Sequence, residues 1–247
     1  MTVAHVKRSP LDPYFADEKL NNIVYPALYA PRLSSNGLPQ QWFLHKTKGG
    51  MTRSNLNISA GDGIRLNAIS TRVGLRSGVV IHQSQDRESL PLAVARIHNR
   101  YFTVALPGKE GADTLPELKL KIDSWKSKSP RVTWQMLVGT NGYYEPEDFE
   151  WRGSNGSWKL IRHAQTGEEV VAVWNVNFTS TRLSGEFQFL KSGATGELGA
   201  AFTYVASVSA LAIGKLLRDT LNAHMDSMAG GYAAVVAGSH EMAELPI

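Results

Sequence analysis

The stretch from Lys119 to Arg131 gathers positive charge around one aromatic residue, a combination that can bind phosphate groups. Asp123 is its one acidic residue. Its basic and aromatic members are Lys119, Lys121, Trp125, Lys126, Lys128 and Arg131. Such side chains suit a phosphate-rich membrane surface, where each cation can add about 1 kcal/mol to binding. We therefore predict a site for anionic lipid headgroups, with a solvated strand edge guarded by lysines as the alternative.

Arginines outside this stretch could enlarge the site. Arg96 and Arg100 lie at a tight connection, and Arg65, Arg72 and Arg76 belong to earlier parts of the basic region. Arginine forms two parallel hydrogen bonds with a phosphate, so it fixes a headgroup better than lysine does. We add Arg96 and Arg100 to the predicted headgroup site, on the condition that their strands are neighbours of the lysine-bearing strand.

Other chemistries find little support in the sequence. It has no G-x-S-x-G, P-loop or G-x-G-x-x-G motif, which disfavours serine hydrolases, NTPases and dinucleotide-binding enzymes. None of the seven histidines has metal-ligand spacing. Carboxylates can exchange protons or bind hard cations, yet the cluster from 145 to 150 lacks an EF-hand pattern and favours a charged hairpin. We expect no enzymatic activity, no cofactor and no metal site.

The 247-residue chain has the composition of a folded protein, with 43% hydrophobic residues. Cysteine is absent, which excludes disulfides, thiolate metal sites and cysteine nucleophiles. Residues 41–135 hold fifteen Lys and Arg against seven Asp and Glu, so a basic face is expected. The first ten residues lack the apolar run of a secretory signal. We expect a cytoplasmic protein, with a peripheral membrane or nuclear location left open.

Apolar and polar residues alternate over many short runs from Gln41 onward. The runs are 42–48, 56–59, 64–70, 79–83, 92–98, 101–106, 118–122, 131–138, 149–152, 158–160, 170–175 and 186–189. Alternation places successive side chains on opposite faces of a sheet that is buried on one side. Turn-forming residues join several of these runs, and no helical pattern separates them. About a dozen antiparallel strands are expected, in a sandwich or a closed barrel.

The pattern changes at Leu198. The seventeen residues from Leu198 to Gly214 carry no formal charge and include Phe202, Val205, Val208 and Leu211. They predict a helix that is apolar on every side and must be buried in protein or in lipid. At about 1.5 Å per residue it spans about 25 Å, whereas a bilayer core needs about 30 Å. We therefore predict a core helix, and a membrane span is the alternative.

One series of hairpins resembles a known superfamily. It comprises 149–152 (Phe-Glu-Trp-Arg), 158–162 (Trp-Lys-Leu-Ile-Arg) and 166–168 (Thr-Gly-Glu) leading into 170–174. With the strand series and the apolar helix, it is similar to the tubby C-terminal-like superfamily of tubby-like proteins, phospholipid scramblases and LURP-one-related proteins. The resemblance covers about residues 24–224. It implies a closed barrel of about twelve antiparallel strands around a central hydrophobic C-terminal helix.

On this basis residues 1–23 are expected to form an N-terminal extension, 24–224 the barrel with its helix, and 225–247 a loosely ordered tail. The palmitoylated cysteine segment of scramblases cannot exist here, and the ending typical of tubby proteins is absent. Phosphoinositide binding and lipid scrambling therefore do not carry over residue by residue.

The resulting functional hypothesis is a monomeric, non-enzymatic domain that docks anionic phospholipid headgroups, with phosphoinositides as candidates. The alternative is an adaptor that binds a protein or a nucleic acid through the same basic residues. Aromatic side chains can stack the bases of single-stranded nucleic acid. The six tryptophans, however, mostly fall at strand positions, which favours packing in the barrel. We expect Trp125 to be the most exposed of the six.

Overall fold

The computed structural model describes residues 38–47, 55–60, 64–72, 77–106, 117–123, 130–140, 143–154, 156–177 and 183–240. The predicted N-terminal extension at 1–23 lies outside these residues, as do 24–37. The chain divides into two compact units, one ending at Ala212 and the other beginning at Ile213. The first unit contains the twelve described strands and the start of the C-terminal helix.

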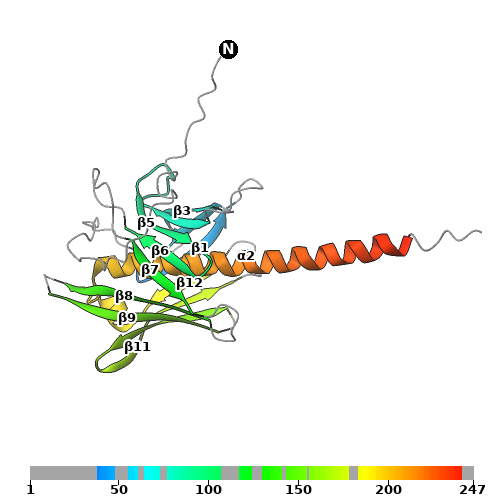
Figure 1. The fold of residues 1–247 in the computed structure, drawn as a ribbon. Helices are drawn as coiled ribbons and strands as arrows, with labels where there is room; N and C mark the ends of the chain where they lie inside the picture. Colours follow the sequence, from blue (N-terminus) through cyan, green and yellow to red (C-terminus); the bar gives the residue numbers. More distant parts are fainter. Residues whose placement is uncertain are drawn as a thin grey trace, which may run out of the picture. The chain divides into compact units, whose positions relative to one another are not determined.

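The secondary structure follows the predicted order of strands and then a helix (Figure 1). The strands are β1 (Gln41–Thr47), β2 (Asn55–Ser59), β3 (Arg65–Arg72), β4 (Gly78–His82), β5 (Pro91–Ile97), β6 (Tyr101–Ala105), β7 (Leu118–Ile122), β8 (Arg131–Thr140), β9 (Tyr143–Ser154), β10 (Ser157–Ala164), β11 (Gly167–Val176) and β12 (Leu183–Phe189). The helices are α1 (Lys191–Thr195) and α2 (Gly199–His240).

The twelve strands close into an antiparallel barrel. Each strand pairs with the next one along the chain, and β12 pairs with β1 to complete the ring. This topology confirms the predicted closed barrel. Closure leaves the ring without an unpaired edge strand, so β1 and β12 are both fully partnered.

Alternation along each strand separates the barrel core from its outer surface. On β8, Val132, Trp134 and Met136 are buried, whereas Arg131 and Gln135 are exposed. The described tryptophans contribute to the core, each at most 5% exposed: Trp42, Trp134, Trp151, Trp158 and Trp174. The expected packing role of these five tryptophans is confirmed.

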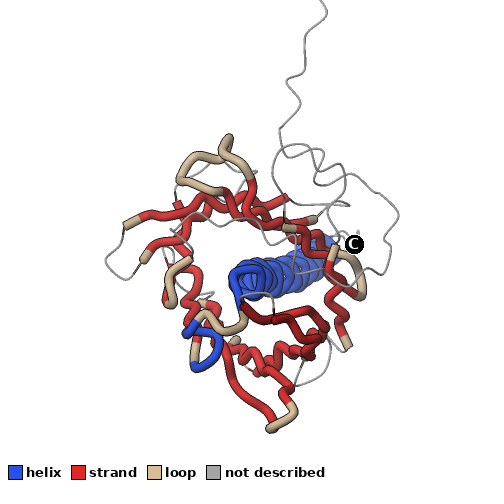
Figure 2. Tube along the Cα trace, turned by 90° about the vertical axis from the view of Figure 1, so that its left-hand side faces the viewer, coloured by secondary structure: helices blue, strands red, loops and turns tan. Residues whose placement is uncertain are grey.

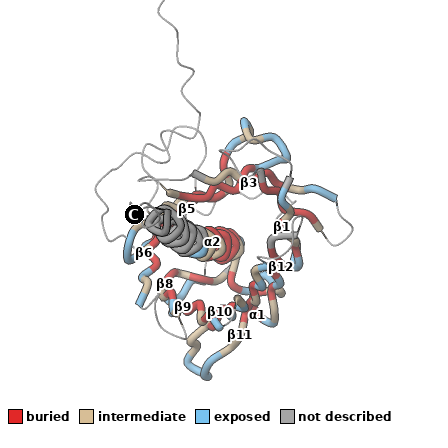
Figure 3. Tube along the Cα trace, turned by 90° about the vertical axis from the view of Figure 1, so that its right-hand side faces the viewer, coloured by how far each residue is buried: buried red, intermediate tan, exposed pale blue. Residues whose placement is uncertain are grey.

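The first part of α2 lies inside the ring of strands (Figure 2). The ring centroid of Phe202 lies 5.0 Å from that of Phe149 on β9. Further along α2, Ser209 Oγ accepts a hydrogen bond of 2.9 Å from the indole Nε1 of Trp151. Figure 3 shows this part of α2 as buried, and Val205, Val208 and Leu211 are at most 4% exposed. The predicted core helix is therefore confirmed for the residues of the first unit.

Glycine is required where α2 begins. Gly199 has a φ of +81°, in the left-handed region that side chains with a Cβ rarely adopt. A Cβ at this position would also lie 2.6 Å from the carbonyl oxygen of Gly139 on β8. The chain can therefore enter the barrel this close to the wall because residue 199 has no side chain.

The second unit continues α2 from Ile213. Lys215 Nζ and Asp219 Oδ2 form an ion pair of 2.6 Å one turn apart. The helical backbone continues to His240, and the loosely ordered tail expected for 225–247 stays a prediction. The segment Gly199–Leu221 is long and apolar enough to cross a membrane by length and composition alone, a criterion that helices buried in protein cores also satisfy.

Candidate functional site

Strand β7 presents two of the predicted lysines on the outer surface of the barrel. Its Leu118 and Leu120 are buried, and the intervening Lys119 and Lys121 are exposed. The rise of a strand places the two lysines about 7 Å apart. Lys121 Nζ lies 2.8 Å from Asp123 Oδ1, but its side chain is 73% exposed, so this ion pair holds the ammonium weakly. Both lysines are accessible to an anionic partner.

Arg96 lies in the same row of the outer surface as Lys119. The strand register places Arg96 opposite Thr103 on β6, and Thr103 opposite Lys119 on β7. Two strand spacings separate the arginine from the lysine, which is about 10 Å. Arg96 Nη1 lies 2.5 Å from Glu117 Oε1, and both side chains are less than a fifth exposed. The positive charge of Arg96 is therefore largely compensated within the protein.

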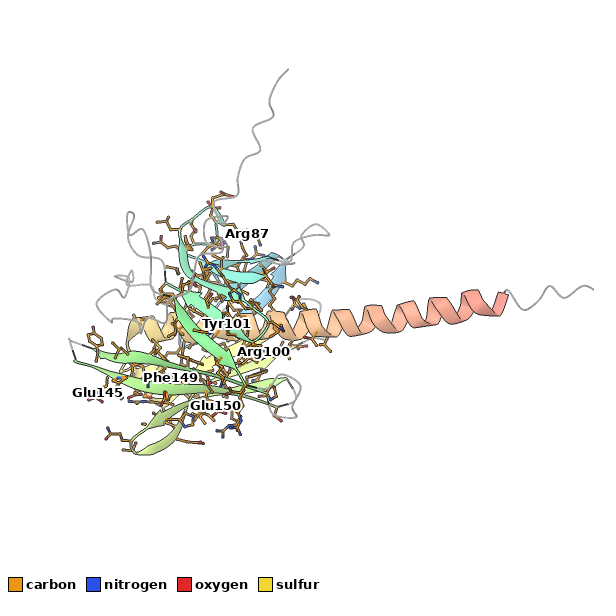
Figure 4. The ribbon with its side chains drawn as sticks, in the orientation of Figure 1. Arg87, Arg100, Tyr101, Glu145, Phe149 and Glu150 are labelled. Carbon is orange, nitrogen blue, oxygen red and sulfur yellow. The ribbon has the colours of Figure 1, made fainter. Side chains whose placement is uncertain are left out.

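Aromatic rings support the lysine-bearing surface. Lys119 Nζ lies 4.5 Å from the ring centroid of Tyr101, a favourable cation–π geometry. The ring of His98 stacks on the ring of Tyr101, with 4.4 Å between the two centroids. Arg100 is exposed in the turn between β5 and β6, directly before Tyr101 (Figure 4). This turn therefore adds a cation beside β7.

Arg131 begins β8, the neighbour of β7 in the ring. Its Nε lies 3.3 Å from Glu150 Oε1 on β9, while its side chain stays 51% exposed. Glu150 is 5% exposed and also accepts hydrogen bonds from Arg152. The hydrogen bond from Arg152 lowers the pKa of Glu150 despite burial, which acts in the opposite direction. Glu150 is thus an ionised counter-ion for Arg131 at neutral pH.

Four predicted residues therefore share the outer face of strands β5 to β8. We call this surface the basic wall; it consists of Arg96, Lys119, Lys121 and Arg131. Trp125, Lys126 and Lys128 lie between β7 and β8, outside the described residues. Arg65 lies on β3, which three strands separate from β7, so it does not join the basic wall. The condition that the strands be neighbours is met by Arg96 and Arg100, but not by Arg65.

Sequence reasoning missed a second charged group, at the barrel end where α2 begins. Arg162 on β10 donates two hydrogen bonds to Glu147, one of 2.6 Å between Nη2 and Oε1. It also lies 3.1 Å from Glu197 and 3.5 Å from Glu169. We call Arg162, Glu147, Glu169 and Glu197 the Arg162 cluster. Because Glu197 lies between α1 and α2, the cluster ties the approach of α2 to strands β9, β10 and β11.

The expected acidic cluster at 145–150 is consequently divided between two environments. Glu147 pairs in register with the buried Met136 and turns toward Arg162. Glu150 pairs in register with Thr133 and binds arginines on the outer surface. Its members therefore do not converge on one cation or substrate site.

A serine–histidine pair lies on β3 and β4. His82 Nδ1 lies 3.2 Å from the carbonyl oxygen of Ser89, which can only accept, so Nδ1 carries the proton. The unprotonated Nε2 then accepts a hydrogen bond of 2.9 Å from Ser70 Oγ. A serine that donates to histidine is the arrangement of an activated nucleophile. Because His82 is 0% exposed, we assign the pair a structural role.

We expect His82 to make the stability of the protein pH-dependent. Burial is the main cause that lowers the pKa of His82 in the folded state. The unfolded chain, with a histidine pKa near 6.5, therefore binds a proton first as the pH falls. The contribution of His82 to stability is complete above about pH 6.5 and is lost below it.

Urea denaturation from pH 7.5 to pH 5 measures this effect. Wild type should lose unfolding free energy more steeply than His82→Gln, by at most about 1.4 kcal/mol per pH unit. The variant retains the other histidines, so their titration is common to both proteins. Parallel pH profiles of the two proteins would contradict the expectation.

No protein family, no curated protein and no solved structure matches this chain. The class of protein is therefore described from the fold alone. The class is that of a closed twelve-stranded antiparallel barrel that encloses the start of an apolar C-terminal helix. On its outer surface this barrel carries the basic wall described above.

Proposed function

We propose that the protein docks on membranes containing anionic phospholipids, through its basic wall. The observation that carries the proposal is the placement of Lys119 and Lys121, which project from β7 beside the half-exposed Arg131. Cations held on one rigid face can contact several lipid phosphates at once, and their contributions to binding accumulate. Binding of this kind is reversible and weakens as salt screens the charges.

The fold supports the same proposal indirectly. A closed barrel around an apolar helix is the architecture that the resemblance to the tubby C-terminal-like superfamily implies. That superfamily includes phospholipid scramblases, so a lipid surface is a reasonable partner to propose. We propose a non-enzymatic role in the cytoplasm, as a monomer that associates with the membrane periphery.

Co-sedimentation with vesicles tests the proposal. Full-length protein is mixed with phosphatidylcholine vesicles with and without 30% phosphatidylserine, at low and at high salt. We expect binding only to the anionic vesicles, and release at high salt. Lys119→Glu with Lys121→Glu should weaken binding at least tenfold, since each lost cation removes about 1 kcal/mol.

A matched double variant controls for net charge. Lys46→Glu with Arg65→Glu makes the same charge change at exposed positions on β1 and β3, which are not neighbours of any strand of the basic wall. Its binding should be much closer to that of wild type. Equal loss in both double variants, or equal binding to neutral and anionic vesicles, would reject docking through the basic wall.

The second candidate function is an adaptor that binds a protein or nucleic acid through the same residues. An electrophoretic shift assay with single-stranded RNA separates the two. Nucleic-acid affinity that falls linearly with salt on a log–log plot, in the absence of vesicle binding, would favour the adaptor.

A further inference from the structure

The arginines and the lysines of the basic wall differ in how far they are already committed to partners. Arg96 is bound to Glu117 in a pair that is mostly shielded from solvent. Arg131 is bound to Glu150, whose carboxylate is almost completely buried. The lysines have looser contacts: Lys121 with the exposed Asp123, and Lys119 with an aromatic ring. Within the basic wall, the cations most available to an external phosphate are therefore the two lysines.

This difference bears on what kind of headgroup recognition is possible. Stereospecific recognition of a phosphorylated headgroup favours arginine, because its planar guanidinium binds phosphate through two parallel hydrogen bonds. Arg96 would have to leave a shielded carboxylate to do so, and separating such a pair is costly. Lysine acts instead as a flexible point charge without a preferred direction of approach.

The spacing of the basic wall leads to the same conclusion. Lys119 and Lys121 are about 7 Å apart along one strand, and Arg96 is about 10 Å from Lys119 across two strands. These side chains project from the convex outer surface of a closed barrel rather than from opposite sides of a pocket. Cations arranged in this way contact several headgroups one by one, and do not surround a single headgroup.

We propose that the basic wall responds to the density of negative charge on a membrane and does not distinguish the stereochemistry of the headgroup. This inference rests on the proposed function and narrows it. Phosphatidylserine at sufficient density should then replace any phosphoinositide. Positional isomers of a phosphoinositide, which carry equal charge, should bind equally well.

Two sets of vesicles test the inference with full-length protein. In the first set, phosphatidylcholine is mixed with phosphatidylserine or with phosphatidylinositol 4,5-bisphosphate, in proportions adjusted to give the same zeta potential. In the second set, the 3,4-, 3,5- and 4,5-bisphosphates are compared at equal mole fraction. We expect affinities within about twofold inside each set. This is well below the tenfold difference that corresponds to about 1.4 kcal/mol of binding free energy.

The possible outcomes separate this inference from the function on which it rests. A tenfold preference for one bisphosphate isomer, abolished by Lys119→Glu with Lys121→Glu, would overturn charge-density recognition and leave membrane docking intact. Absence of binding to every anionic vesicle would overturn both. Equal binding inside each set, lost to the same extent in the double variant throughout, would support both.

Discussion

Replacement of Arg162 by methionine should lower the free energy of unfolding by about 3–5 kcal/mol, the usual cost of removing one partner from a buried ion pair. Arg162 is 15% exposed and faces carboxylates from Glu147, Glu169 and Glu197. Methionine retains much of the apolar volume but none of the charge. Glu147, at 13% exposed, would be left without the cation that compensates it. Urea denaturation at pH 7 measures the loss.

Two further variants show whether the charge is responsible. Arg162→Met combined with Glu147→Met removes both members of the closest pair and should recover much of the stability, because an apolar pair can replace a buried ion pair at little cost. Arg152→Met should lose less than Arg162→Met. Arg152 is 35% exposed, and Glu150 keeps Arg131 as a partner. If Arg162→Met lowers the free energy of unfolding by less than about 1 kcal/mol, the Arg162 cluster does not stabilise the fold as proposed.

The strands were most predictable where one face is purely apolar. On β7 the alternation of leucine and lysine is complete, and both the strand and its exposed face follow from it. On β9 the predicted run at 149–152 is much shorter than the observed Tyr143–Ser154. The reason is that Glu147 occupies an inward position, where Arg162 on the next strand compensates it. A charged residue on the inner face breaks the alternation of apolar and polar residues. The sequence pattern alone does not identify the residue that compensates its charge.

Strand β4 illustrates a second limit of pattern reading. All five of its residues are buried, so no alternation distinguishes its two faces. The polar His82 is accommodated there because Ser70 on β3 and the carbonyl of Ser89 satisfy both ring nitrogens. These partners are 12 and 7 residues away in the sequence. Local composition therefore predicted a strand in this region but gave no reason to expect a buried histidine.

The location of the candidate site was predictable, but the ion pairs that neutralise its arginines were not. The sequence placed Lys119, Lys121 and Arg131 together because they follow one another closely along the chain. It did not reveal that Arg96 binds Glu117, or that Arg131 binds Glu150, because these contacts depend on the strand register. The order of strands in the ring likewise decides that Arg65 is remote from β7. Charge counting along a sequence thus overestimates how much positive charge a surface offers to a ligand.

Replacement of Phe202 by alanine should also destabilise the barrel by about 3–5 kcal/mol, the range for truncating a buried aromatic side chain. Phe202 is 0% exposed, and its ring packs against Phe149 on β9 and Phe189 on β12. The aromatic contacts therefore join the enclosed part of α2 to two separate strands of the barrel. The milder Phe202→Leu should cost about 1.5 kcal/mol and keeps the protein folded for binding assays.

An exposed leucine supplies the control, and vesicle binding supplies an independent readout. Leu90→Ala truncates a side chain that is 57% exposed, so its unfolding free energy should stay within about 0.5 kcal/mol of wild type. Equal stability of Phe202→Ala and Leu90→Ala in urea would contradict the enclosed helix. Folded Phe202→Leu should bind anionic vesicles as wild type does, because the basic wall lies on the outer face of β5 to β8, whereas Phe202 packs inside the barrel against β9 and β12. Loss of vesicle binding in this folded variant would instead link the helix itself to the lipid surface.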